Sequence, residues 1–326
     1  MKRFVTLFII IFSLQAYSYE VGPSYVSISP SYQRGDFHSK IEDTRINSLY
    51  NEKIKDINWA AFSIDAQMNF FENFLVQIQG NFAYGSSHHS HLNLIIPVGE
   101  RPFQLSAPGS FSYDTDSFRW KIGTKLGYHY RLGAIVLQPK LGFIYNDLKL
   151  KRDKISPYPF TVQQLTTSVT GTIFPYNDVD IRWYTPILGL NLVFLIDPHA
   201  HWNLLACYEY LIGPAHFSTY YLHNEIATTP ISRKMLFYKE KQKSTKAGDG
   251  HFLDLGLRYG ISRWFFFGIG FQYEHFRIFS GKIKDEWKGY IIENNIRTNN
   301  NFTQKPHLSH FRFQSFNFYL SLAVQY

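Results

Sequence analysis

Large apolar side chains alternate with smaller or polar ones along the last residues of the chain, FNFYLSLAVQY. A two-residue period places alternate side chains on opposite faces of a β-strand, so this segment is predicted to be a strand with one apolar face. The period runs to the final residue, although chain ends are usually poorly ordered. We therefore expect the end of the chain to be paired in a sheet. The apolar positions are Phe316, Phe318, Leu320, Leu322, Val324 and Tyr326.

The same alternation recurs along the chain in hairpin-like pairs. Residues 251–261 and 264–274 both alternate, and only Ser262 and Arg263 separate them, which predicts a two-residue hairpin. Three further pairs meet at short turns, around residues 71–73, 131–133 and 197–201. With an opening and a closing strand, this makes ten strands. The remaining predicted strands are 24–33, 58–70, 74–84, 117–130, 134–146, 182–196, 202–212 and 310–326.

Short turns alternate with five long polar connections, at 34–57, 85–116, 147–181, 213–250 and 277–309. This alternation is typical of an outer-membrane barrel, in which the turns face the periplasm and the loops face outside. We therefore predict an all-β fold, a transmembrane antiparallel up-and-down β-barrel of ten strands. Residues 158–174 could add a hairpin above the membrane or within the wall, so twelve strands is the second choice. A soluble β-sandwich also has alternating strands, but it needs no lipid-sized apolar face on every strand.

Aromatic residues support the membrane assignment. They make up 18% of the chain, whereas the mean hydropathy of −0.21 reflects polar loops and a polar lumen. After Leu14, no apolar run is long enough for a membrane helix. Near the predicted strand ends, the lipid-facing positions carry rings that we assign to interfacial girdles. These are Trp59, Tyr84, Trp120, Tyr128, Tyr130, Trp202, Tyr210, Tyr259 and Trp264.

The beginning of the chain has the pattern of a secretory signal peptide. A basic start, MKR, precedes an apolar core over residues 4–14 and the small-x-small sequence AYS. We predict a signal peptide over residues 1–18 and a single barrel domain over residues 19–326, in the bacterial outer membrane. One cysteine, Cys207, permits no intrachain disulfide. The formal net charge is +8, and because export argues against nucleic acid as a partner, we assign it to contacts with outer-membrane lipid and lipopolysaccharide.

Ionisable residues occupy the polar parity of several strands, which would face the lumen. They serve either to plug the lumen or to guide a solute through it. Ten strands lie near the closed end of the size range, since eight strands are filled by side chains. Glycines at the same parity, such as Gly256, Gly268 and Gly270, have no side chain and leave part of the lumen unfilled. The lumen-lining set is Asp65, Arg119, Lys121, Lys125, Lys140, Glu209, Asp254, Arg258 and Glu274.

Two features of the predicted loops are candidate binding sites. His88, His89 and His91 are close together, but no carboxylate or thiol lies beside them in the sequence, so we expect solvated histidines and no metal. A basic run at 234–246 is either a solvated loop or a contact for lipopolysaccharide phosphates.

The strand layout, loop lengths and chain length resemble those of the omptins, the outer-membrane aspartyl-type proteases. Local likeness is seen in residues 118–143, FRWKIGTKLGYHYRLGAIVLQPKLGF, in the last hairpin and in the terminal strand. The resemblance implies two acidic residues near the top of the third strand and an Asp–His pair on the far wall, which activate water. Residues 81–87 contain no acid, and the position two before His223 is Tyr221. The nearest acidic pair, Asp114 and Asp116, is interpreted as a turn cap at the start of the fourth strand, so we predict no enzymatic activity.

The mass, single cysteine and Phe/Tyr/Lys/Asn bias also resemble the porin-type outer-membrane proteins of chlamydia-like symbionts. Our interpretation is a non-enzymatic barrel without cofactor that gives small solutes a narrow, weakly anion-preferring path. The alternatives are an omptin-like surface protease, and a surface adhesin or structural barrel that acts through its loops. Barrels of this class imply that a closing strand ending in an aromatic residue, here Tyr326, is recognised by the barrel-assembly machinery.

Overall fold

The computed structural model describes residues 24–43, 48–71, 73–98, 105–153, 158–163, 168–173, 175–196, 201–228, 233–262, 264–278, 281–282, 284–293, 296–304 and 307–326. All the regular structure in these ranges is β-strand. Residues 1–18, the predicted signal peptide, lie outside the described residues. Within the described ranges, no helix has the length and apolar character to cross a membrane.

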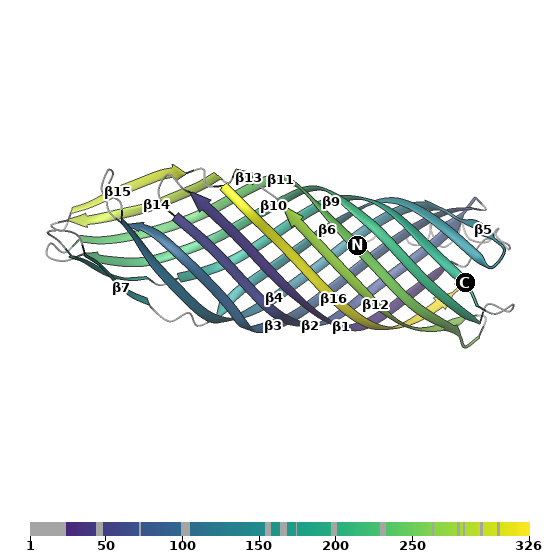
Figure 1. Ribbon diagram of the computed structural model, residues 1–326. Coiled ribbons are helices and arrows are strands. Elements are labelled where there is room, and N and C mark those ends of the chain that lie inside the picture. Colours follow the sequence, from purple (N-terminus) through teal and green to yellow (C-terminus); the bar gives the residue numbers. More distant parts are fainter. Residues whose placement is uncertain are drawn as a thin grey trace, which may run out of the picture.

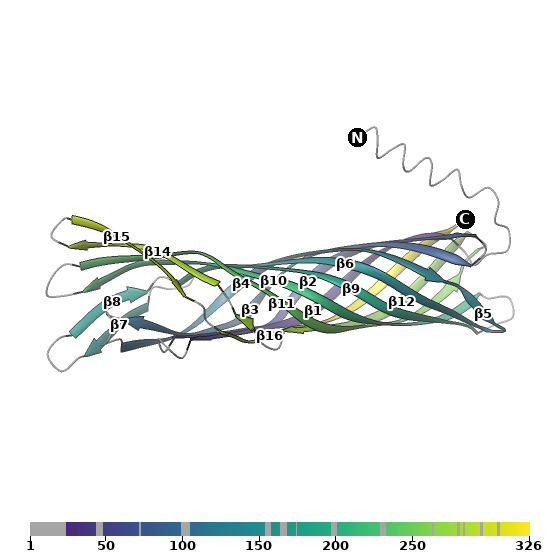
Figure 2. The same cartoon turned by 90° about the horizontal axis from the view of Figure 1, so that it is seen from above.

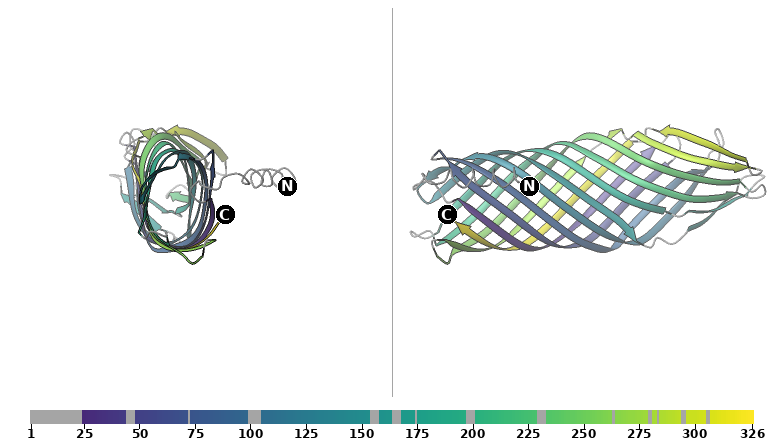
Figure 3. Two further views of the ribbon diagram at one scale, coloured as in Figure 1. Left: turned by 90° about the vertical axis from the view of Figure 1, so that its right-hand side faces the viewer. Right: turned by 180° about the vertical axis from the view of Figure 1, so that it is seen from behind.

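Ten long antiparallel strands form a closed barrel, which confirms the predicted fold class and strand number (Figure 1). The order around the wall is β10-β9-β6-β4-β3-β2-β1-β16-β12-β11, and the pairing of β10 with β11 closes the ring. Viewed along its axis, the wall forms an oval ring (Figure 3). The strands are β1 (Tyr25–Asp43), β2 (Ser48–Phe70), β3 (Phe74–Val98), β4 (Leu105–Tyr128), β6 (Ile135–Asp153), β9 (Pro175–Leu195), β10 (Trp202–Thr228), β11 (Arg233–Gly260), β12 (Phe265–Ile278) and β16 (His307–Gln325).

In the described ranges, six shorter strands lie outside this ring or extend it. β14 pairs with the upper part of β11 and with β15, so this hairpin lengthens the wall on one side (Figure 2). β7 and β8 form a separate two-stranded sheet, so the extra hairpin proposed for residues 158–174 stands outside the wall and the twelve-strand choice is wrong. The short strands are β5 (Tyr130–Leu132), β7 (Tyr158–Gln163), β8 (Ser168–Ile173), β13 (Gly281–Lys282), β14 (Lys284–Glu293) and β15 (Ile296–Gln304).

The prediction that the five long connections are loops is wrong, because the strands continue through most of each one. In β4, alternation is unbroken, but its polarity inverts near Ser117. Below this point, toward the short turns, apolar side chains such as Phe118 and Ile122 are exposed on the outside. Above it, Phe111 and Tyr113 are buried inside while Asp114 and Asp116 are exposed. The upper wall therefore has an apolar inner face and a polar outer face, like the wall of a soluble barrel.

The exposed apolar positions form a band next to the short turns. On β4 the band runs from Phe118 to Tyr128, a length that suits a tilted strand crossing a bilayer. On β16 and the residue after it, the six apolar positions from Phe316 to Tyr326 are 41–60% exposed, as the alternation predicts. Six of the nine predicted girdle residues are exposed large rings, and Trp120 and Tyr210 are half-buried. The exposed ones are Tyr84, Tyr128, Tyr130, Trp202, Tyr259 and Trp264.

Trp59 is the exception, and its assignment to the lipid face is wrong. Its side chain is fully buried inside the barrel, and its indole Nε1 donates to Ser117 Oγ at 2.9 Å. Trp59 and Asp65 are six residues apart on β2, so an unbroken strand must place them on the same face. A bulge lies just above, at Asp56, whose φ of 54° shifts the register between β1 and β2. Its amide donates to Asp36 Oδ1 at 2.9 Å.

The closing strand pairs with the opening strand, so this edge of the sheet is not left free. The register joins Val26 to Val324 and continues up to Glu42 and His307. The amide of Tyr326 donates to the carbonyl of Ser24 at 3.0 Å, so pairing extends to the last residue.

The short turns lie at the same end as the apolar band. Phe71 and Gly133, with positive φ angles of 44° and 61°, form two of them where predicted. The predicted two-residue hairpin at 262–263 is wrong, because β11 ends at Gly260 and β12 begins at Phe265. This longer turn is held by Ser262, whose Oγ accepts from the amides of Trp264 and Phe265 at 3.2 Å.

Candidate functional site in the barrel lumen

All nine predicted lumen residues have side chains on the inner side of the wall, and they divide into an upper and a lower group. In the upper group, Glu274 of β12 forms ion pairs with Arg119 and, at 3.6 Å, with Lys121. Both partners lie on β4, five strands away around the ring, so these ion pairs cross the lumen. Lys125, also on β4, forms an ion pair with Glu209 of β10 and donates to Gln79 at 2.9 Å.

Hydrogen bonds from neutral side chains dominate the lower group. Asp65 accepts from Tyr25 at 3.0 Å and from Gln77 at 2.8 Å. Lys140 donates to the same Gln77 at 2.7 Å, so Gln77 lies between the lysine and Asp65.

Asp254 has the equivalent arrangement on the other side of the lower lumen. It accepts from Gln272, its cross-strand neighbour, at 3.0 Å and from Tyr319 at 2.9 Å. Arg258 differs from Arg119, Lys121 and Lys125, because no described carboxylate forms an ion pair with it. Lys140 has none either, but it donates to Gln77, whereas the guanidinium of Arg258 lies over the Tyr25 ring at 5.1 Å.

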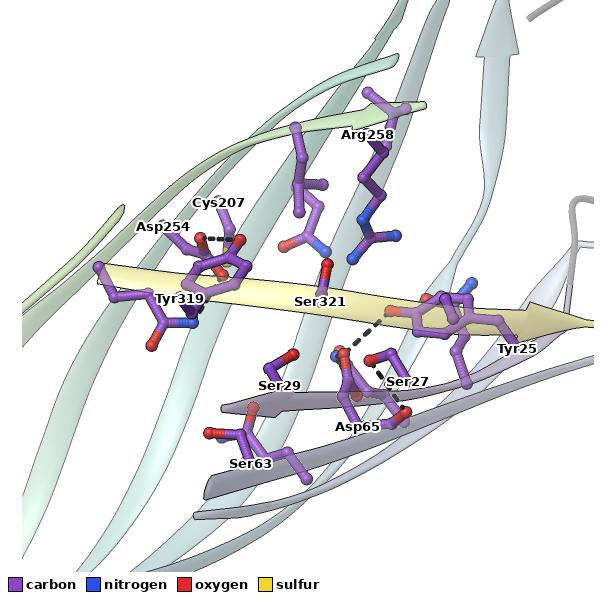
Figure 4. A pocket seen from close by; sticks show the side chains of 18 of the residues that line it. Tyr25, Ser27, Ser29, Ser63, Asp65, Cys207, Asp254, Arg258, Tyr319 and Ser321 are labelled. Atoms are coloured by element: carbon purple, nitrogen blue, oxygen red, sulfur yellow. Dashed lines mark hydrogen bonds between the residues drawn. The ribbon is translucent and has the colours of Figure 1, made fainter. Parts of the chain in front are cut away.

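These groups surround a cavity of about 830 Å³ within the membrane half of the barrel. Its lower end is lined by the turn residues Asn73, Arg131 and Ser262, so it opens toward the short turns. Its upper end is lined by Arg119 and Glu274. Figure 4 shows part of the lining, with hydroxyl, carboxylate and guanidinium groups projecting inward from neighbouring strands. The membrane half of the lumen is thus a polar chamber open at one end.

An aromatic layer lies directly above this chamber. We use this name for six inward-facing rings, each with 1% or less of its surface exposed. Trp183 of β9 stacks on Phe276 of β12 at 5.2 Å and contacts Phe313 at 5.8 Å, so the rings meet across the lumen. Arg119 lies 4.8 Å from the centroid of the Phe313 ring and joins this layer to the polar chamber. The aromatic layer comprises Phe37, Trp59, Trp183, Phe276, Phe311 and Phe313.

In the described residues above the aromatic layer the interior is largely apolar, with a buried polar cluster around Glu52. Ile54, Leu148 and Ile181 are among the buried residues there. Glu52 accepts from Arg152 Nε at 2.8 Å and from the hydroxyl of Tyr113. Burial raises the pKa of Tyr113 well above its usual value, which keeps the phenol protonated as a donor. This part of the barrel therefore resembles the core of a soluble protein rather than a channel.

The sequence prediction missed the aromatic layer, although its signal was present. Trp183 has the parity of Gly189, Phe276 that of Glu274, and Phe313 that of Ser315. Each ring could therefore have been placed inside by counting in twos along its strand.

The acidic pair considered from the omptin resemblance lies on the outside of the barrel. Asp114 and Asp116 lie within β4 rather than at its start, so their interpretation as a turn cap is wrong. Both are exposed on the outer face, where Asp114 lies 3.1 Å from His88. His223 lies on the upper part of β10, opposite Phe237 of β11.

The other loop features also lie on long strands. His88, His89 and His91 belong to β3, and His91 contacts Asn93 at 3.1 Å. Across the described part of the chain, no group of three or more His, Cys, Asp or Glu residues is placed to hold a metal. The basic run at 234–246 belongs to β11, and its side chains lie outside those described.

A closed barrel with an apolar outer band and a polar lower lumen defines an integral outer-membrane protein. Residues 31–325 match the model of the family described as Protochlamydia outer membrane protein, Pom. The chain belongs to this family, and it is a bacterial outer-membrane protein. No curated protein matches the chain.

One solved structure with a similar fold is that of an outer-membrane protease. The outer membrane protease OmpT from Escherichia coli has a TM-score of 0.59 and 10% identity, with 96% of this chain and 100% of OmpT covered. At that identity the similarity shows the fold alone. Ail, the attachment invasion locus protein of Yersinia pestis, has a TM-score of 0.23 and 14% identity, with 57% of this chain and 86% of Ail covered. The TodX deltaS2S3 mutant monoaromatic hydrocarbon channel has a TM-score of 0.28 and 9% identity, with 93% and 91% covered.

Proposed function

We propose that this protein is a closed outer-membrane barrel that acts at the cell surface through its tall extracellular wall. The observation that carries the proposal is the aromatic layer, which separates the polar chamber from the outside. Its rings are almost completely buried, and they join strands on different sides of the lumen through the Trp183–Phe276 stack. A solute moving straight through the barrel would have to displace this packing.

The upper wall supplies the surface for this role. β10 and β11 remain paired up to Thr228 and Arg233, far beyond the apolar band, and β14 and β15 add to the same side. Figure 2 shows these strands projecting at the end opposite the short turns. Just above the band, the outer face carries ion pairs such as Arg34–Asp56 and Arg277–Asp249. A paired, charged wall is suited to contact with a polar partner surface.

A second candidate is the passage of small solutes, which the sequence pattern predicts. The polar chamber favours it, because five basic and four acidic residues point into the membrane half of the barrel. Passage would need an open state in which the aromatic layer moves. The small basic excess would then prefer anions. Surface proteolysis is a separate candidate activity. It would be indicated if the wild-type protein cleaved a dibasic peptide and His223→Ala did not.

Two measurements distinguish these functions. In planar lipid bilayers, the purified protein is expected to give no single-channel current steps over a range of voltages. On cells, removal of the β14–β15 hairpin is expected to reduce adhesion to host cells or neighbouring bacteria, while Trp183→Ala leaves adhesion intact. Regular current steps from the wild-type protein would overturn the closed-barrel proposal and favour solute passage. Unchanged adhesion without the hairpin would remove that hairpin from the proposed contact surface.

A further inference from the structure

We propose that the polar chamber is a binding site for a zwitterionic small molecule, an amino acid or short peptide with free termini, that enters from the periplasmic side. Arg258 would bind the carboxylate of this ligand, and Asp65 and Asp254 would bind its ammonium group. The proposal concerns the lower lumen and does not depend on what the upper wall contacts.

The first observation is the arrangement of side chains around β12. Gly256, Gly270 and Tyr319 occupy neighbouring strands at one level, and a Cβ at Gly270 would lie 2.3 Å from the Tyr319 ring. The missing side chains let Tyr319 lie across β12 and reach Asp254 on β11. At the next level, a Cβ at Gly268 would lie 3.3 Å from Cγ of Arg258. The glycines therefore provide the space in which the tyrosine and arginine lie against the wall.

The second observation is that Arg258 lacks an ion-pair partner among the described carboxylates. The lumen cations Arg119, Lys121 and Lys125 all form ion pairs with a buried glutamate. Arg258 lies over the Tyr25 ring and interacts electrostatically with Asp65 and Asp254, but it forms no ion pair with any carboxylate in the described ranges. Its guanidinium projects into the space between Tyr319 and Tyr25 (Figure 4). A guanidinium with free donors inside a cavity is suited to two parallel hydrogen bonds from one carboxylate.

The third observation is the pair of aspartates on either side of this guanidinium. Asp65 is held by Tyr25 and Gln77, and Asp254 by Tyr319 and Gln272. All four donors are neutral, so they orient the two carboxylates without neutralising their charges. In this low-dielectric setting an ammonium group would be attracted to both.

Together these groups select the class of ligand. A simple anion bound to Arg258 would be repelled by the two aspartates, and a simple cation would be repelled by Arg258. A zwitterion satisfies both charges at once. The cavity volume of about 830 Å³ is sufficient for a short peptide, and Ser27, Ser29 and Ser321 supply hydroxyl groups along it.

The test is titration calorimetry on the full protein, purified from outer membranes in detergent. The probes are glycine, dialanine and trialanine with free termini, each at up to millimolar concentration. Blocking the amino terminus by acetylation, or the carboxyl terminus as an amide, is expected to weaken binding by roughly tenfold or more, because a hydrogen-bonded charge is lost. Arg258→Gln is expected to lose the preference for a free carboxylate, and Arg258→Lys to retain part of it.

Arg312→Gln is the matched control, because Arg312 is exposed on the outer face of β16. It is expected to bind like wild type. Heat-dependent gel mobility checks that each variant is folded. If none of the three probes binds to the folded wild-type protein, or if Arg258→Gln binds blocked and free probes as wild type does, the proposal is overturned. Current steps in bilayers would contradict the closed barrel but leave this binding result intact, so the two failures are distinguishable.

Discussion

Replacement of Trp183 by alanine tests the aromatic layer most sharply. The indole is fully buried, stacks on Phe276 with an interplanar angle of 9°, and contacts Phe313. Its Nε1 has no hydrogen-bond partner among the described groups, so the substitution removes packing rather than a hydrogen bond. Replacing a buried tryptophan by alanine typically lowers the free energy of unfolding by about 3–5 kcal/mol, of which ring stacking contributes about 0.5–1.5 kcal/mol. We expect a loss of about 4 kcal/mol in the free energy of unfolding.

The assay is urea unfolding in lipid vesicles, followed by the gel mobility of the folded barrel. The control is Trp120→Ala, because Trp120 is on the outer face and contacts Tyr145 with ring centroids 4.7 Å apart. Lipid can fill the space that this outer ring leaves, so we expect a loss of only about 1 kcal/mol, the size of one ring contact. Equal losses in the two variants, or a Trp183→Ala protein as stable as wild type, would refute the account of the aromatic layer.

Three further predictions concern assembly, ion pairing and packing in the wall. Deletion of Tyr326 is expected to lower the amount of folded protein in outer-membrane fractions more than any loop change does, and normal amounts would contradict this. Lys125→Ala leaves Glu209 buried without its ion pair, which we expect to cost about 3–5 kcal/mol of unfolding free energy. Replacing both residues by Met and Leu should cost less, so an equal or larger loss in the double variant would count against an uncompensated charge. Gly270→Ala is expected to destabilise the barrel by about 1–3 kcal/mol, because its new methyl group overlaps the Tyr319 ring.

Two surface variants provide controls for these measurements. Lys151 is exposed, so Lys151→Ala should change the unfolding free energy by about 0.5 kcal/mol or less. A Cβ at Gly80 would lie 3.9 Å from Phe82, an ordinary contact, so Gly80→Ala should be tolerated. A loss at Gly80 as large as that at Gly270 would show that glycine is needed for backbone reasons rather than for the space beneath Tyr319.

The membrane half of the fold could be predicted from the sequence because its pattern has one physical cause. Lipid outside and water inside impose a two-residue period on each strand, as the six apolar positions of β16 illustrate. Strand number, the pairing of the first and last strands, and the inward direction of residues such as Arg119 and Asp254 follow from that period. The upper wall was missed because its apolar face turns inward, as Phe111 and Tyr113 do, and no lipid-facing stripe remains to be recognised.

The contacts that define the site could not be predicted in the same way. A linear pattern shows that Arg119 and Glu274 face the lumen, but not that they meet across it, 155 residues apart in the chain. The bulge at Asp56 depends on one positive φ angle and changes the parity of β2 above Trp59. The space filled by Tyr319 likewise requires the register that places it beside Gly270.

The most direct test of the central claim measures from which side of the membrane a reagent can reach the chamber. Ser29 lines the chamber below the aromatic layer, and Ser29→Cys in a Cys207→Ser background provides a single thiol there. An exposed thiol from His88→Cys in the same background reports on the outer surface. With a membrane-impermeant maleimide, we predict that intact cells label position 88 but not position 29, and that position 29 reacts once the periplasm is opened. Labelling of position 29 in intact cells would contradict a lumen closed by the aromatic layer.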